Sequence, residues 1–233
     1  SAEASAEDSK MKVLEEVEEG YVEGMDDDEE EEKEVKEVRK KHAFVSQDEM
    51  DFVDLPEWLS VYPLHKALLK SLKEVGFERP TPIQTAVMPV ALGKRWDVIG
   101  ASQTGSGKTL AFGLPILHQI LELQEKAHRL DEPMDDSLKA LILSPTRELA
   151  LQIVDHLEKC IGTNAYIKIA PVIGGMSVTK QMRYLRKRPD IIVATPGRLW
   201  ELISSGLVAE SGNSLADLRW LVFDEADKMV EFG

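Results

Sequence analysis

The segment ASQTGSGKTLAFGLPIL, residues 101–117, places a glycine-rich loop directly before an apolar helical stretch. Gly105 and Gly107 lie two residues apart, a spacing typical of a backbone that bends tightly or approaches another group closely. The preceding run WDVIGA, residues 96–101, is short and apolar, and it predicts a strand. A strand, a glycine-rich turn and a helix in this order are the context of a phosphate-binding loop.

The residues of this loop fit a nucleotide phosphate with Mg²⁺. Glycines let successive backbone N–H groups turn inward around an anion, and the following helix adds N-terminal donors. Lys108 would reach the β- and γ-phosphates, and the Thr109 hydroxyl would bind Mg²⁺. The expected phosphate-binding residues are Ser102, Gln103, Thr104, Gly105, Ser106, Gly107, Lys108 and Thr109. Ser102 stands where the common pattern has its first glycine, so an ordinary turn before a helix is the alternative for this loop alone.

The segment RWLVFDEAD, residues 219–227, predicts the second half of a nucleotide site. Its apolar run leads directly into Asp224 and Glu225, which would lie at the carboxyl end of a parallel strand, where ligands bind in α/β sheets. We expect Asp224 to hold Mg²⁺ through water and Glu225 to deprotonate the attacking water, so that these two and Lys108 are the catalytic residues. The alternative is an acidic helix start after a strand, which leaves the phosphate loop unexplained.

The apolar runs of the chain predict an α/β domain. Their hydrophobicity is continuous rather than alternating, as in parallel strands that are buried on both faces. The runs are WDVIGA, ALILS, IKIAPVIG, DIIVAT and WLVFD. Helical patterns lie between them at 109–124, 147–161, 177–187 and 198–205. Strands that alternate with helices predict a doubly wound, mostly parallel sheet within residues 52–233.

Charge and composition separate this domain from an acidic N-terminal segment. The chain has a net charge of −14, and residues 1–41 alone hold 17 acidic and 7 basic side chains. Because this stretch has little apolar surface, we expect residues 1–51 to be a disordered tail that the domain does not need for folding. The single cysteine, Cys160, excludes an internal disulfide. The sequence has neither an 18-residue apolar run nor a secretory signal, so we expect no membrane partner.

Six motifs in a fixed order make the chain resemble the DEAD-box RNA helicases over residues 55–233. The motifs are GFERPTPIQ (76–84), TGSGKT (104–109), PTRELA (145–150), GG (174–175), TPGR (195–198) and DEAD (224–227). The resemblance implies a RecA-like domain with ATP and Mg²⁺ as cofactors, RNA as partner, and a second RecA-like domain in the parent chain. The SAT motif of the family is absent, which implies a domain incomplete at its C-terminus. Its strand would lie between those ending at the phosphate loop and at Asp224. We therefore expect residues 1–233 alone to be marginally stable and not to unwind RNA.

The resemblance also assigns the remaining site residues. Gln84 would read the edge of adenine, with Phe77 and Trp58 as flat apolar area near the base; the alternatives are a helix-surface residue for Gln84 and core packing for Trp58. The expected RNA-binding residues are Pro145, Thr146, Arg147, Gly174, Gly175, Thr195, Pro196, Gly197 and Arg198. PTRELA can also be read as a helix cap without a ligand. The basic segment 179–188 is either a further positive patch or a solvated helix face.

The resemblance therefore predicts part of a monomeric ATP-dependent RNA helicase that separates short RNA duplexes. Ribosome biogenesis is the expected process, and the nucleus or nucleolus the expected location, with the cytoplasm as the alternative. A non-catalytic clamp for ATP and RNA is a competing hypothesis, which the presence of Lys108 and Glu225 disfavours. A DNA-directed translocase is another, which the complete GFERPTPIQ and DEAD motifs disfavour.

Overall fold

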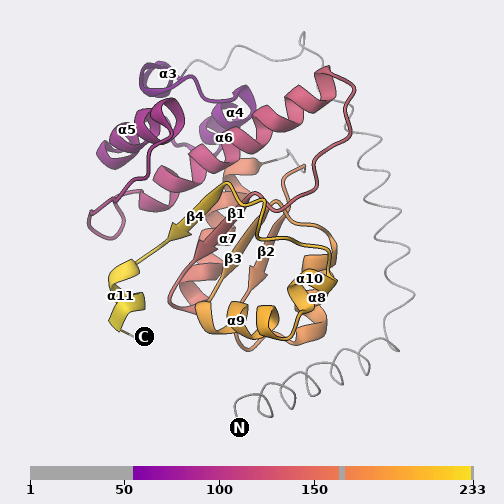
Figure 1. Ribbon diagram of the computed structural model, residues 1–233. Helices are drawn as coiled ribbons and strands as arrows, with labels where there is room; N and C mark the ends of the chain where they lie inside the picture. The colour runs from indigo at the N-terminus through magenta and orange to yellow at the C-terminus, as the bar shows by residue number, and fades with distance from the viewer. Residues whose placement is uncertain (1–54, 163–165, 232–233) are drawn as a thin grey trace.

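The computed structural model describes residues 55–162 and 166–231 (Figure 1). The expected acidic tail, residues 1–51, lies outside them. The described residues form a four-stranded parallel sheet in the order β2-β3-β1-β4. The strands are β1 (Ala140–Leu143), β2 (Ile169–Val172), β3 (Ile191–Ala194) and β4 (Trp220–Phe223). This parallel sheet confirms the predicted α/β class.

Alternate residues of the strands face two separate hydrophobic cores. Ala140 and Ile142 of β1 pack with the larger core, which the helices within residues 56–161 supply, whereas Leu141 packs with the smaller core under the helices at 178–186, 196–204 and 207–210 (Figure 1). Ile191 and Ile192 of β3 divide between the cores in the same way. A strand that is buried on both faces needs apolar side chains at every position, which explains the continuous hydrophobic runs.

The helices before β1 build most of the larger core, and at least one helix follows each strand. The first group is α3 (Pro56–Val61), α4 (Lys66–Val75), α5 (Pro82–Met88), the π-helix η2 (Pro89–Lys94) and α6 (Lys108–Arg129). The second group is α7 (Arg147–Ile161), α8 (Val178–Arg186), α9 (Pro196–Ser204), α10 (Leu207–Glu210) and α11 (Ala226–Glu231). None of the described helices combines the length and the apolar character that crossing a membrane requires.

The sheet register aligns the carboxyl ends of all four strands. Ala140 of β1 lies opposite Ile191 of β3 and Trp220 of β4, and Ile169 of β2 lies opposite Ile191. The strands have equal lengths, so the loops that follow them leave the sheet at one edge. The motifs PTRELA, GG, TPGR and DEAD therefore begin along a single edge.

The predicted strand at WDVIGA is wrong for the described sheet. Residues 95–103 are irregular, and Ile99 is fully exposed. Within the described residues β4 is an edge strand that pairs only with β1, and its Leu221 and Phe223 are about half-exposed. A strand forms only with a neighbour that completes its ladder of hydrogen bonds, and none of the four described strands pairs with residues 96–101.

A buried histidine fixes α6 to the start of α4. The Nδ1 atom of His118 accepts a hydrogen bond from the His65 backbone N–H over 3.0 Å, and its ring packs edge-on against Tyr62. Burial lowers the pKa of His118 below its ordinary value of 6.5; the Glu122 charge opposes this shift, and His65 adds to it. The folded chain therefore holds His118 neutral at a pH where the unfolded chain begins to protonate it.

We expect this histidine to make the fold acid-sensitive. Below about pH 6.5 His118 binds a proton in the unfolded state but stays neutral in the native state. The free energy of unfolding therefore falls as the pH falls from about 6.5 toward the lowered pKa of the native state. Urea unfolding of the wild type and of His118→Gln at several pH values measures this effect. The variant should be less stable at neutral pH and should show a shallower loss on acidification. An identical pH dependence in both proteins would contradict the assignment.

Candidate nucleotide and RNA site

The glycine-rich loop closes around the side chain of its own lysine. Lys108, the first residue of α6, donates hydrogen bonds from Nζ to the carbonyl oxygens of Ser102, at 2.5 Å, and Gln103, at 3.0 Å. The Ser102 and Ser106 hydroxyls lie 2.6 Å apart and share a hydrogen bond. Gly105 and Gly107 have φ angles of 79° and 91°, which favour glycine. The loop thus presents one ammonium group and the N-terminus of a 22-residue helix at one point.

Gln84 is packed directly against this loop. Its side chain is buried; Nε2 donates to the Gly107 carbonyl over 3.1 Å, and Oε1 accepts from the Thr81 N–H over 2.8 Å. A Cβ atom on Gly107 would lie 2.5 Å from Gln84 Nε2, so only glycine permits this approach. An amide has two N–H donors and two acceptor lone pairs, so these two contacts leave one of each unused. The helix-surface alternative for Gln84 is therefore wrong.

Trp58 is a core residue, which corrects the expectation that it lies beside the base. Its side chain is 0% exposed, and Nε1 donates to the Phe77 carbonyl over 2.8 Å. Trp58 therefore holds the backbone at Phe77, whose own side chain is 42% exposed. Sequence could not separate the two roles, because an indole ring serves equally well for packing and for stacking.

Asp224 and Glu225 follow β4 at the same edge of the sheet. The Asp224 N–H donates to the Leu143 carbonyl over 2.9 Å, which fixes the end of the strand. Burial raises the pKa of Asp224 above its usual value, and the Glu225 charge raises it further, whereas the Lys108 ammonium opposes the rise. Lys108 of the glycine-rich loop is therefore close enough to Asp224 for its charge to act on that carboxylate.

Glu225 has an unusual backbone and a basic neighbour that sequence reasoning missed. Its φ of 49° lies in the left-handed region, which costs a non-glycine residue about 1–3 kcal/mol and is typical of functional sites. Its carboxylate pairs with Lys228, three residues later on α11. Proximity in helical spacing is the only signal that the sequence offered for this pair.

All but one of the expected RNA-binding residues line one groove at the carboxyl ends of β1, β2 and β3. The groove has a volume of about 580 Å³. Its lining comprises Pro145, Thr146, Arg147, Glu148, Gly174, Thr195, Pro196, Gly197, Arg198 and Met229. Glu148 and Met229 were not predicted to take part, and Met229 reaches the groove from α11 with no signal in the sequence.

Gly175 is the predicted residue that does not line the groove, and it supports Arg147 instead. Its φ is 77°, and a Cβ atom there would collide with the Arg147 guanidinium. Arg147 therefore lies across bare backbone at this position. The Thr146 hydroxyl accepts from the Leu149 N–H over 3.2 Å and caps α7, so PTRELA serves both as a helix start and as part of the groove wall.

Arg198 is largely committed to contacts within the chain. It donates to Gln181 Oε1 over 3.3 Å, to Glu201 Oε1 over 2.6 Å and to the Met176 carbonyl over 3.2 Å. A guanidinium has five N–H donors, so only part of its capacity faces the groove. This geometry favours bracing of the loop after Gly175 over the direct RNA contact that was expected of Arg198.

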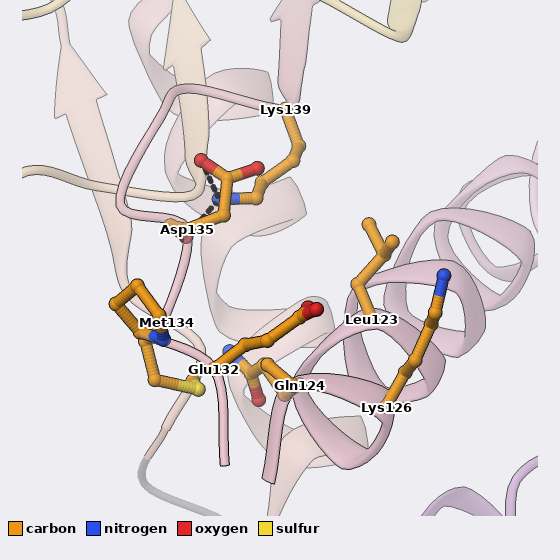
Figure 2. Close-up of a pocket in the computed structure, with 9 residues that line it drawn as sticks. Leu123, Gln124, Lys126, Glu132, Met134, Asp135 and Lys139 are labelled. Atoms are coloured by element: carbon orange, nitrogen blue, oxygen red, sulfur yellow. Dashed lines mark hydrogen bonds and ion pairs between the residues drawn. The ribbon is translucent and has the colours of Figure 1, made fainter. Parts of the chain in front are cut away.

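A smaller cavity of about 140 Å³ lies between α6 and the loop before β1 (Figure 2). Lys139 borders it and is buried; its Nζ lies 3.5 Å from an Asp190 carboxylate oxygen and 3.7 Å from an Asp135 one, and it donates to the Ser137 carbonyl. Burial raises the pKa of Asp190, while the Lys168 N–H and the Lys139 charge oppose the rise. These contacts saturate the lysine, so the cluster holds the amino ends of β1 and β3 together.

One group of potential metal ligands in the described residues is invisible to linear spacing. Ligand atoms of His65, Glu122 and Glu125 lie within 4.8 Å of one another. However, Nδ1 of His65 accepts from the Ala67 N–H, so the neutral ring keeps its proton on Nε2, which lies 3.3 Å from Glu125. The observed arrangement is a close polar contact that links the start of α4 to α6.

Comparison with known proteins identifies the family that this chain resembles. The family model for DEAD/DEAH box helicases matches residues 81–233. The chain is similar to the DEAD-box ATP-dependent RNA helicase 13 of Oryza sativa subsp. japonica, with 50% identity over 179 residues, 73% of this chain and 21% of that protein. It is also similar to the ATP-dependent RNA helicase ddx24 of Dictyostelium discoideum, with 40% identity over 81% of this chain and 23% of that protein.

A solved structure with the same fold is the RNA-helicase Prp28 from Chaetomium thermophilum bound to ADP. The match has a TM-score of 0.63 and 33% identity, and it covers 82% of this chain and 48% of that one. The chain thus spans about a fifth to a quarter of the length of the curated relatives that it matches.

Proposed function

The chain belongs to the DEAD/DEAH box helicase family, and we propose that it forms the ATP- and RNA-binding part of an ATP-dependent RNA helicase. The observation that supports this most directly is geometric: the glycine-rich loop holds Lys108 at the N-terminus of α6, and Asp224 and Glu225 follow the end of β4, close enough for the Lys108 charge to affect Asp224. A phosphate loop opposite paired carboxylates is the arrangement that phosphoryl transfer requires. The groove along the same edge then brings a second ligand next to the nucleotide.

The residues present fit an Mg²⁺–ATP complex. We propose that the loop N–H groups and Lys108 bind the phosphates, while the Thr109 hydroxyl and the Asp224 carboxylate hold Mg²⁺, oxygen ligands that this ion prefers. Asp224 and Glu225 repel each other, and a divalent cation would relieve that repulsion. Bound Mg²⁺ would neutralise phosphate charge. We propose that Glu225 accepts the proton of an attacking water, because the loop and Lys108 are assigned to the phosphates.

We propose that the groove binds the backbone of a single RNA strand. Arg147 supplies a cation, and the N-termini of α7 and α9 supply N–H donors, all of which suit phosphate. Contacts of this kind fix the register of a strand without reading its sequence.

A second RecA-like domain, ribosome assembly as the process and a nuclear or nucleolar location are proposals that follow from the family. The presence of Glu225 favours ATP hydrolysis over the alternative of a non-catalytic clamp. Competition between RNA and DNA for binding to the groove would test the alternative of a DNA-directed translocase.

Nucleotide selectivity tests the ATP site. Titration of the chain with fluorescent ATP and GTP analogues should show about tenfold or greater preference for ATP, because guanine mismatches the free donor and acceptor of Gln84, at about 1–3 kcal/mol per unpaired group. Gln84→Ala should remove most of this preference. Gln152→Ala is the matched control, because it removes an exposed amide from α7, and it should keep the preference. Equal affinity of the wild type for both nucleotides would overturn the adenine-reading role.

A further inference from the structure

Helix α8 carries a basic face that the proposed ATP and RNA sites do not use. The segment GGMSVTKQMRYLRKRP, residues 174–189, contains no acidic residue, although the whole chain has a net charge of −14. Val178, Met182 and Leu185 bury one side of α8 in the smaller core. Lys180 and Arg183 on the other side are exposed. Within residues 55–162 and 166–231, neither of these two forms an ion pair with a carboxylate.

The first turn of α8 is built into the wall of the groove. Gln181 is fully buried; its Nε2 donates to the Ile173 carbonyl over 2.8 Å and to the Met176 carbonyl over 3.0 Å. Its Oε1 accepts from Arg198, which itself lines the groove. The Ser177 hydroxyl caps the helix by accepting from the Lys180 N–H. The basic face therefore begins at a fixed position beside Gly174.

Helical geometry aligns the exposed cations away from that point. Residues three positions apart lie close to one face of an α-helix, so Lys180 and Arg183 lie on one side of α8, and Lys187 follows directly after its last residue. The rise of about 1.5 Å per residue separates Lys180 and Arg183 by about 4.5 Å along the helix axis. Such a row of cations can follow successive phosphates of a strand.

We propose that Lys180 and Arg183 continue the path of the RNA strand from the groove along α8 by binding its phosphates. This inference rests on the proposed function of the groove. RNA is favoured over the acidic segment 26–32 of the same chain because Gln181 and Arg198 connect α8 directly to the groove wall. A strand that leaves the groove beside Gly174 would meet Lys180 first and then Arg183.

The test compares two single-stranded RNAs, on the order of 6 and 16 nucleotides long, by fluorescence anisotropy over a range of salt concentrations. In the full chain, the double variant Lys180→Gln/Arg183→Gln should bind the longer RNA about tenfold more weakly and the shorter one unchanged. Its salt dependence for the longer RNA should decrease by about 0.7 per lost phosphate contact. The matched control is Lys70→Gln/Lys73→Gln, which removes two exposed charges from α4, and melting curves verify that each variant folds.

The outcomes separate this inference from the proposed function. If Arg147→Ala weakens both RNAs but the α8 double variant binds both like the wild type, the continuation along α8 is wrong and the groove stands. If the α8 double variant binds the longer RNA more tightly, α8 holds another anionic segment, such as residues 26–32, and the continuation is again wrong. If Arg147→Ala changes neither RNA, the groove is not the RNA site, and the inference falls with it.

Discussion

Lys108→Ala is expected to abolish binding of ATP and GTP alike. The Lys108 ammonium is held by two carbonyls of its own loop, and a bound phosphate would replace both with charge-assisted hydrogen bonds. Each such bond contributes about 1.5–3 kcal/mol, so the loss of two lowers affinity about 10²- to 10⁴-fold. Isothermal titration calorimetry with Mg²⁺ present measures this directly.

A matched control keeps this result interpretable. Lys126→Ala removes a lysine from the last turn of the same helix, and it should leave nucleotide affinity unchanged. Thermal unfolding adds a second readout, because a nucleotide that binds only the folded state raises the melting temperature in the wild type and in Lys126→Ala. A Lys108→Ala variant whose melting temperature still rises with ATP would mean that the loop is not the phosphate site.

The order of the motifs along the chain explains why several of their residues line one groove, whereas local composition misplaced one strand. The motif residues follow apolar runs, and the carboxyl ends of parallel strands meet at one edge, so Arg147, Gly174 and Thr195 could be placed in one groove from order alone. The run at residues 96–101 has the composition of a strand, but pairing depends on a neighbour that local composition does not reveal. Ile99 is consequently exposed rather than buried.

Contacts between distant residues account for the other differences. Gln84 reaches the Gly107 carbonyl across 23 positions, and His65 meets Glu125 through the packing of α4 on α6. No periodic pattern encodes such pairs, because they depend on how whole helices pack. The sequence likewise could not reveal the contacts of Arg198. An arginine suits phosphate, but in the fold its guanidinium donates to three acceptors of the protein itself.

Trp58→Ala is expected to be the most destabilising single change among these predictions. The side chain is completely buried in the larger core, and its removal leaves a cavity as well as an unpaired Phe77 carbonyl. Truncation of a buried tryptophan costs about 3–5 kcal/mol, a large share of the roughly 5–15 kcal/mol that stabilises a typical domain. Urea unfolding followed by circular dichroism measures the loss. Trp200→Ala is the matched control, because Trp200 is 70% exposed and its removal should change stability by about 0.5 kcal/mol or less.

Trp58→Phe separates the packing role of this residue from its effect on the nucleotide site. Phenylalanine keeps most of the ring in the core but cannot donate to the Phe77 carbonyl, so the loss of stability should be smaller, about 1–3 kcal/mol. Because that hydrogen bond holds the backbone at Phe77, the variant should also bind ATP several-fold more weakly at temperatures where it is fully folded. If ATP affinity is unchanged in Trp58→Phe while stability falls, Trp58 contributes only to the core, and the exposed Phe77 ring is positioned by other contacts.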